Sequence, residues 1–97
     1  MSLNPNQKRH LRGLAHALHP LIQIGQRGIT EPLLAELGQA LDHHELVKVR
    51  LAGDRDERQA QTAALIEATG AELVQAIGGI ACLFRRNREQ PVIELPR

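Results

Sequence analysis

The chain has 97 residues and a formal net charge of +1, with 12 Lys and Arg residues against 11 Asp and Glu residues. Hydrophobic residues make up 42% of it, which excludes a disordered polar segment and supplies one modest core without disulfides or metal. No apolar run approaches membrane-spanning length, and the single cysteine, Cys82, cannot form an internal disulfide. We therefore expect a soluble cytoplasmic protein of one domain, residues 1–97, that acts as a monomer without membrane contact.

The charges are distributed unevenly along the chain. Residues 1–30 contain four basic residues and no acidic one, whereas residues 31–45 contain four acidic residues and no Lys or Arg. The basic residues of the first stretch are Lys8, Arg9, Arg12 and Arg27, and a second basic group near the end comprises Arg85, Arg86 and Arg88. This asymmetry predicts a basic face opposite an acidic one, unless the charges lie on a solvated surface and never converge.

Residues 5–18 predict the first helix, because apolar residues recur there at helical spacing. These residues are Leu11, Leu14, Ala15 and Leu18. Basic side chains lie away from this stripe, most of them on one face of the helix. They are Lys8, Arg9, Arg12, His16 and His19. A helix that is apolar on one side and basic on the other suits an RNA-facing surface, although an ordinary solvated helix has the same pattern.

A strand predicted over residues 20–24 is followed by the loop Gly25-Gln26-Arg27-Gly28, and Thr30 is a good N-cap for the next helix. The glycines let this G-x-x-G loop turn tightly and leave N–H groups beside the positive end of the helix dipole, where phosphates bind. Arg27 adds a planar charged donor that suits phosphate oxygens. Nucleotide-binding glycine motifs are absent, so the loop is nearest to those that clamp an RNA backbone. A plain turn between strand and helix is the alternative.

The rest of the chain predicts two more helices and three more strands, with a further short edge strand in the tail. The helices run from Thr30 to about residue 43 and from about 56 to 69, where Gly70 is a C-cap. The strands cover residues 46–51, 72–77 and 80–85, the last two joined by the hairpin signal Gly78-Gly79, and the edge strand covers residues 91–95.

The element order is thus α-β-α-β-α-β-β. Right-handed crossovers make the first strands parallel, and the hairpin makes the last strand antiparallel. Three helices can cover one face of a four-stranded mixed sheet, so the predicted fold class is an α/β two-layer sandwich. Alternation over residues 46–51 directs Lys48 and Arg50 to the face away from the core, which can be open to solvent.

Candidates for catalysis are few. His43-His44-Glu45 suggests a metal site or a general base, but neighbouring residues on a helix do not face the same way, and zinc needs three or four ligands. Cys82 lies in an apolar run and is expected to be a buried small hydrophobe. The chain has no Trp or Tyr, and Phe84 is its only Phe. Bases therefore cannot stack across the sheet, and any RNA is bound through phosphates, sugars and shape. We expect no catalytic residue, no metal and no cofactor.

Several segments together resemble the YhbY family, the single-domain bacterial version of the CRM (chloroplast RNA splicing and ribosome maturation) domain. The strongest are QKRHLRGLAH at residues 7–16 and PLIQIGQRGIT at residues 20–30. The others are residues 40–49, 69–71, 74–78 and 95–97, so the resemblance covers essentially the whole chain.

The resemblance implies a non-catalytic RNA-binding protein that associates with ribosomal RNA in precursors of the large (50S) subunit during ribosome biogenesis. It also implies the sheet order 1-2-4-3, similar to the C-terminal domain of translation initiation factor 3. The implied RNA site is the loop with the adjacent basic surface. Its residues are Gly25, Gln26, Arg27, Gly28, Lys8, Arg9, Arg12 and His16.

Two other functions remain open from the sequence. One is a metal-dependent RNA-processing enzyme that uses His43, His44 and Glu45. The other is a protein-binding scaffold that uses the acidic second helix, which requires an exposed apolar patch for which the sequence offers no clear candidate. The sequence also leaves open which further basic residues join the RNA-binding face. These are Lys48, Arg50, Arg85, Arg86 and Arg88.

Overall fold

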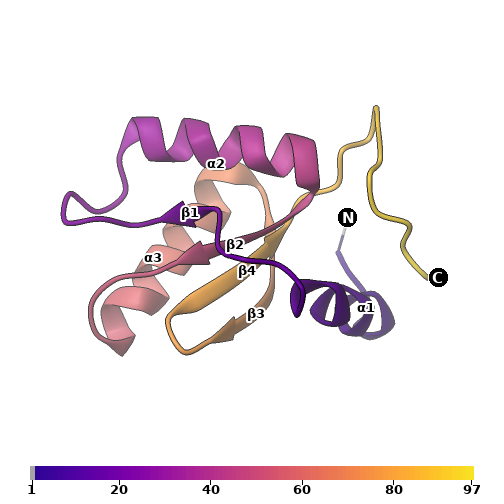
Figure 1. Cartoon of the computed structure of the whole chain (residues 1–97), viewed down its shortest axis with the longest axis horizontal. Helices are drawn as coiled ribbons and strands as arrows, with labels where there is room; N and C mark the ends of the chain where they lie inside the picture. Colours follow the sequence, from indigo (N-terminus) through magenta and orange to yellow (C-terminus); the bar gives the residue numbers. More distant parts are fainter. Residues whose placement is uncertain (1) are drawn as a thin grey trace.

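The computed structural model describes residues 2–97 and contains three helices and four strands in the predicted order (Figure 1). They are α1 (Pro5–Ala15), β1 (Ile22–Gln23), α2 (Glu31–His44), β2 (Leu46–Arg50), α3 (Arg55–Thr69), β3 (Glu72–Ile77) and β4 (Ile80–Phe84). No helix among the described residues is both long enough and apolar enough to cross a membrane.

The four strands form one mixed sheet in the order β1-β2-β4-β3. Strand β1 is parallel to β2, and β4 is antiparallel to both of its neighbours, β2 and β3. This confirms the predicted α/β class, the strand directions and the order 1-2-4-3. The connection from β2 through α3 to β3 leaves room for β4, which returns through the Gly78-Gly79 turn and pairs between them.

Strand β1 is shorter than predicted, but its pairing with β2 extends beyond its two regular residues. The N–H of Leu21 donates to the carbonyl of Lys48 at 3.1 Å, and the N–H of Ile24 donates to that of Arg50 at 2.9 Å. These bonds hold the chain in line with β2 up to the first glycine of the G-x-x-G loop.

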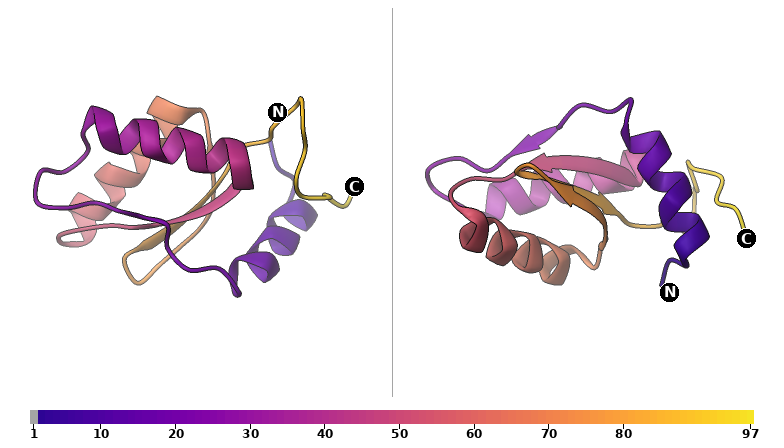
Figure 2. Two further views of the ribbon diagram at one scale, coloured as in Figure 1. Left: turned by 45° about the horizontal axis from the view of Figure 1, so that its top comes forward. Right: turned by 90° about the horizontal axis from the view of Figure 1, so that it is seen from below.

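Helices α2 and α3 cover one face of the sheet. Their buried leucines, Leu37, Leu41 and Leu65, pack with the inward side chains of β2 and β4, of which Val47 and Leu83 face each other across the pair. Figure 2 shows the two helices lying against the sheet while α1 lies apart at its end. This layer contains the larger of the two apolar clusters.

Helix α1 packs on the opposite face, so the prediction that all three helices cover one face is wrong. Leu11 and Ala15 of α1 pack with Leu46, Cys82 and Phe84. The residues next to these in the strands, Val47 and Leu83, point into the other apolar cluster, on the opposite face. Because β4 is apolar at every position, it buries side chains on both faces, and the second face needs a cover of its own. Alternation within β2 alone does not reveal this.

The helix ends follow their capping residues. Asn4 and Asp54 form capping boxes with Gln7 and Glu57, which is why α3 begins at Arg55. Gly70, with φ 73°, ends α3 in the left-handed conformation as predicted. Helix α1 ends at Ala15, earlier than predicted.

The tail does not form the predicted edge strand. Residues 85–97 follow β4 as an irregular segment that crosses toward α1, so both ends of the described chain lie at the same end of the molecule (Figure 1). The N–H groups of Val92 and Ile93, which a strand would offer to a neighbour, donate instead to the carboxylate of Glu45 at 2.8 and 2.7 Å.

The packing predicts that truncating a buried and an exposed apolar side chain will lower the free energy of unfolding by very different amounts. Leu37→Ala removes a side chain that is 0% exposed and is expected to cost about 2 to 5 kcal/mol of unfolding free energy, because it leaves a cavity. Ile77→Ala, at a residue that is 66% exposed, is expected to cost less than about 1 kcal/mol. Urea unfolding followed by far-UV circular dichroism measures both, since the chain has no Trp or Tyr. Equal losses would contradict the assignment of the core.

Candidate nucleic-acid interface

The G-x-x-G loop is a tight turn closed by its two glycines. The N–H of Gly28 donates to the carbonyl of Gly25 at 3.0 Å, and Gly28 has φ 71°, a conformation that favours glycine. A side-chain carbon at Gly28 would meet nothing within 4 Å, so backbone conformation rather than space requires the glycine. Gln26 and Arg27 are exposed at the tip. One of the N–H groups expected to meet phosphate is therefore used inside the turn.

The start of α2 is also less available to an anion than the sequence suggests. Thr30 caps the helix as predicted, and its hydroxyl accepts from the N–H of Leu33 at 3.3 Å. Glu31 lies in the first turn, where its carboxylate already interacts favourably with the positive end of the dipole. Arg27 is consequently the main charged donor that the loop can present to a phosphate.

Helix α1 has two different flanks. On one, the tail packs alongside it, with the Gln7 amide donating to the carbonyl of Pro96 at 3.0 Å. On the other flank lie Lys8 and Arg12, which are half-buried, and exposed His16 at the end of the helix. Arg9 is exposed as well. The basic face predicted for α1 is therefore left uncovered by the tail.

The loop and α1 lie toward opposite ends of the longest axis, along which the molecule extends 39 Å (Figure 1). The predicted site residues therefore do not form one compact cluster. Whether the loop and α1 belong to one basic surface depends on the residues that lie between them.

The open part of the sheet connects the two regions. Lys48 and Arg50 alternate with Val47 and Val49, which are buried under α2 and α3, so they face the same side as α1. Arg50 is exposed and lies beside Gln23 of β1 in the pairing register. Lys48 lines a hollow of about 280 Å³ together with His16, and none of the residues lining this hollow is acidic. Lys48 and Arg50 thus bridge the gap between α1 and the loop.

Arg85 and Arg86 do not join this surface, because both are engaged within the fold. Arg85 donates to the carbonyls of Thr69 and Gly38 at 2.9 and 3.0 Å and pairs with the Asp42 carboxylate at 2.8 Å. Arg86 donates to the carbonyl of Ile93 and lies 3.6 Å from the Glu45 carboxylate. Arg88 is exposed beyond them in the tail.

The His43-His44-Glu45 sequence does not assemble into a reactive site. The carboxylate of Glu45 is completely buried and accepts the N–H groups of Asn87, Val92 and Ile93 at 2.6 to 2.8 Å. The two imidazole rings lie 6.4 Å apart, and His43 hydrogen-bonds the carbonyl of Gln39. Across residues 2–97, no three His, Cys, Asp or Glu side chains are grouped so that they could hold a metal ion.

The titratable groups at the centre of the fold are structural. Burial raises the pKa of Glu45. The N–H groups of Ile93, Asn87 and Val92 and the charge of Arg86 together lower this pKa by more than burial raises it, so it lies below its usual value of 4.5. Burial raises the pKa of the Cys82 thiol to about 11, although the nearby charge of Lys48 opposes this. Cys82 is therefore a protonated, buried side chain, as the sequence predicts.

The profile of the CRS1 / YhbY (CRM) domain matches residues 3–85. The chain is a member of this family. A Haemophilus influenzae protein named an RNA-binding protein is 46% identical over 97 residues, which cover 99% of this chain and 97% of that protein. Bacillus subtilis YqeI, named a probable RNA-binding protein, is 36% identical, with 97% of this chain and 99% of that protein covered.

A solved structure agrees with this assignment. The solution structure of a Staphylococcus aureus protein, described as a candidate RNA-binding protein, superimposes with a TM-score of 0.82 at 40% identity. The match covers 98% of this chain and 100% of that one. The CRM fold found here is therefore the fold of an experimentally determined relative.

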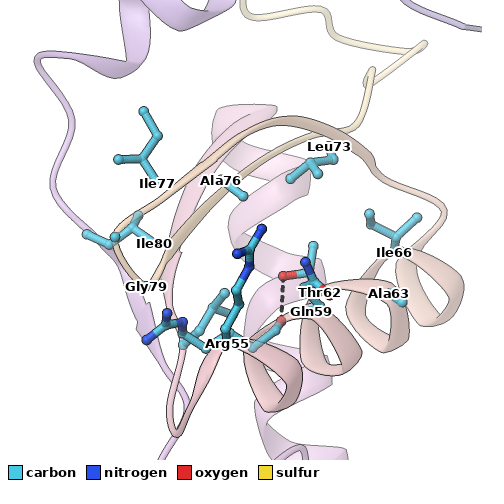
Figure 3. Close-up of a pocket in the computed structure, with 13 residues that line it drawn as sticks. Arg55, Gln59, Thr62, Ala63, Ile66, Leu73, Ala76, Ile77, Gly79 and Ile80 are labelled. Atoms are coloured by element: carbon cyan, nitrogen blue, oxygen red, sulfur yellow. Dashed lines mark hydrogen bonds between the residues drawn. The ribbon is translucent and has the colours of Figure 1, made fainter.

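The CRM domain has a second hollow, between α3 and the β3–β4 hairpin (Figure 3). It measures about 490 Å³ and combines Arg55 and Arg58 of α3 with apolar side chains such as Ile66 and Leu73. The Arg58 guanidinium donates to the carbonyl of Gly53 at 3.2 Å. Because these arginines come from α3, they lie in the layer opposite Lys48 and do not extend the open sheet face.

The buried carboxylate predicts a pH-dependent stability. Because the folded pKa of Glu45 is depressed, its contribution is complete above the usual pKa of 4.5 and is lost as the pH falls through the folded pKa. Glu45→Gln is expected to cost about 3 kcal/mol at neutral pH, since it removes the negative charge that faces Arg86 and leaves a backbone N–H without its acceptor. The difference from the parent should stay constant from neutral pH down to the usual pKa of 4.5 and should shrink as the pH falls below it.

Urea unfolding across this pH range measures the effect. Glu94→Gln, at an exposed acid in the same tail, is the matched control and should leave stability nearly unchanged at every pH. A loss in Glu45→Gln that does not vary with pH would show that the charge of Glu45 is not what stabilises the tail.

Proposed function

We propose that this chain is a non-catalytic, cytoplasmic RNA-binding protein that binds ribosomal RNA in precursors of the large ribosomal subunit. The observation that carries the proposal is the separation of charge across the sheet. Arg50 and Lys48, followed by the basic flank of α1, lie on the side away from the acidic helix α2, and Arg27 is exposed in the loop that follows the neighbouring strand β1. Among the described residues, the ion pairs involve Arg85 and Arg86, neither of which belongs to this row.

The proposed contact surface starts at the loop and ends at α1. The loop contributes Gly25, Gln26, Arg27 and Gly28, and α1 contributes Lys8, Arg9, Arg12 and His16. We add Lys48 and Arg50, which the sheet places between these two groups. A surface of this length with separated cations suits a structured RNA, along which successive phosphates can be neutralised.

Family membership supports RNA as the ligand, because the relatives described above carry RNA-binding names. The composition supports the manner of binding. Phe84 is buried and no Tyr or Trp is present, so contacts to phosphates and sugars supply the affinity. The catalytic alternative gains no support from the geometry, since the Glu45 carboxylate is fully engaged.

The open sheet face is tested by changing Lys48 and Arg50 together. The logarithm of the affinity for a structured ribosomal RNA fragment should fall linearly with the logarithm of the salt concentration, with a slope of roughly 0.7 to 0.9 per phosphate contact. The double variant Lys48→Gln/Arg50→Gln should therefore reduce the slope by roughly 1.4 to 1.8. Fluorescence anisotropy titrations at several salt concentrations measure this. Glu36→Gln on α2 is the control and should bind at least as well as the parent, and an unchanged slope in the double variant would remove this face from the site.

The loop is tested by an isosteric pair at Gly28. Asp and Asn tolerate its positive φ about equally, so the two variants share any backbone cost and differ in charge. Gly28→Asp should bind RNA roughly tenfold or more weakly than Gly28→Asn, because the carboxylate repels the phosphates. Anisotropy titrations with thermal melts separate lost contact from unfolding. If the two folded variants bind equally well, the loop is a turn and not a phosphate contact.

A further inference from the structure

A group of exposed apolar side chains lies beside the proposed RNA surface. Five large apolar residues are exposed in the described part of the chain, and four of them line one groove of about 570 Å³. They are Leu14 (40% exposed), Leu18 (38%), Leu21 (53%) and Val92 (58%). Scattered apolar residues are ordinary on a protein surface, but a contiguous group marks an interaction site.

Three separate parts of the chain build this groove. The groove is lined by the end of α1 and the linker to β1, by the tail, and by Leu46 and Val47 of β2. The sequence could not reveal the patch, because its members are brought together only by the packing of α1 and the tail. The groove is also not the surface of the acidic second helix, which the sequence suggested as a protein-binding face.

The groove is held open by interactions within the fold. Glu45 fixes the N–H groups of Val92 and Ile93, and the ammonium group of Lys48 donates to the carbonyl of Leu18 at 3.2 Å. Both walls are therefore anchored without an occupant. A preformed apolar groove gives a partner more affinity because little ordering is needed on binding.

The charges at the groove indicate the kind of occupant. His19, His44 and Lys48 lie among the lining residues, and none of the lining residues is acidic. The apolar walls are aliphatic and contain no Phe, Tyr or Trp, so they suit aliphatic side chains better than bases. A second copy related by a two-fold axis would place this basic border against itself. An apolar segment flanked by carboxylates fits both features.

We propose that the groove binds the apolar face of an acidic amphipathic helix from a partner protein. Leucine-like side chains of the helix would occupy the space between Leu18, Leu21 and Val92, and flanking Asp or Glu residues would face Lys48 and the histidines. This inference goes beyond the proposed function and does not depend on it. Lys48 lies between the groove and the hollow beside His16, so RNA and partner would occupy adjacent surfaces.

Site-specific photocrosslinking in the cells that produce the protein tests the proposal. A photoreactive residue replaces Val92 in the full chain, and Ile77, exposed on the edge strand, is the control position. We expect a nuclease-resistant protein adduct from position 92 and not from position 77, with the crosslinked segment identified by mass spectrometry as apolar residues flanked by Asp or Glu. An RNA adduct, an adduct with a second copy, a segment without acidic flanks, or no adduct would overturn the proposal.

A charge pair at Leu21 separates the apolar and electrostatic parts of the contact. Leu21→Glu should reduce the adduct roughly tenfold or more, because it adds a like charge inside the contact. Leu21→Lys should reduce it less, and equal losses would overturn the acidic character of the partner. Both variants should keep the parental urea midpoint, since Leu21 is exposed. RNA affinity is measured in parallel, so failure of the proposed RNA function would appear there and not in the adduct.

Discussion

The buried carboxylate of Glu45 is the interaction on which the arrangement of the chain ends depends. Glu45 ends α2 and has φ 62°, an unusual conformation for a residue with a side chain, which turns the chain directly into β2. Its N–H remains bonded to the carbonyl of Leu41, and its carbonyl accepts from the N–H of Arg85. With the backbone fixed on both sides, the carboxylate has one direction in which to point, and the tail supplies its donors.

This anchoring determines what α1 presents to solvent. The tail is held at Val92 and Ile93, continues to Pro96 and Arg97, and there accepts hydrogen bonds from Gln7 and Asn6 of α1. One flank of α1 is covered in this way, so its basic residues remain on the flank that faces the open sheet. Position 45 thus helps to orient a helix whose last residue, Ala15, lies thirty residues away in the chain. It does so through hydrogen bonds and not through apolar packing alone.

The sequence predicts the elements well because their signals are local. Capping residues, the alternation of β2 and the glycine pair of the hairpin each act over a few residues, so the element order follows from them. The strand order 1-2-4-3, which pairs distant segments, comes instead from the family resemblance. The side of the sheet covered by α1, the irregular tail and the groove at Leu21 depend on contacts between distant segments. Glu45 shows the limit clearly: beside two histidines it suggests chemistry, and only its burial and its three backbone donors reveal a structural role.

The same contrast applies to the arginines, which the sequence presents as one class. Arg85 and Arg86 bind carbonyls and carboxylates inside the fold, whereas Arg27 and Arg50 are exposed. In the loop, the turn uses the N–H of Gly28, and Glu31 occupies the helix start, so fixed backbone dipoles contribute less to anion binding than the glycine motif suggests. In the proposed RNA site, binding then rests on cationic side chains spread along the sheet. Such side chains follow the path of phosphates without reading bases, which favours a ligand defined by shape over one defined by sequence.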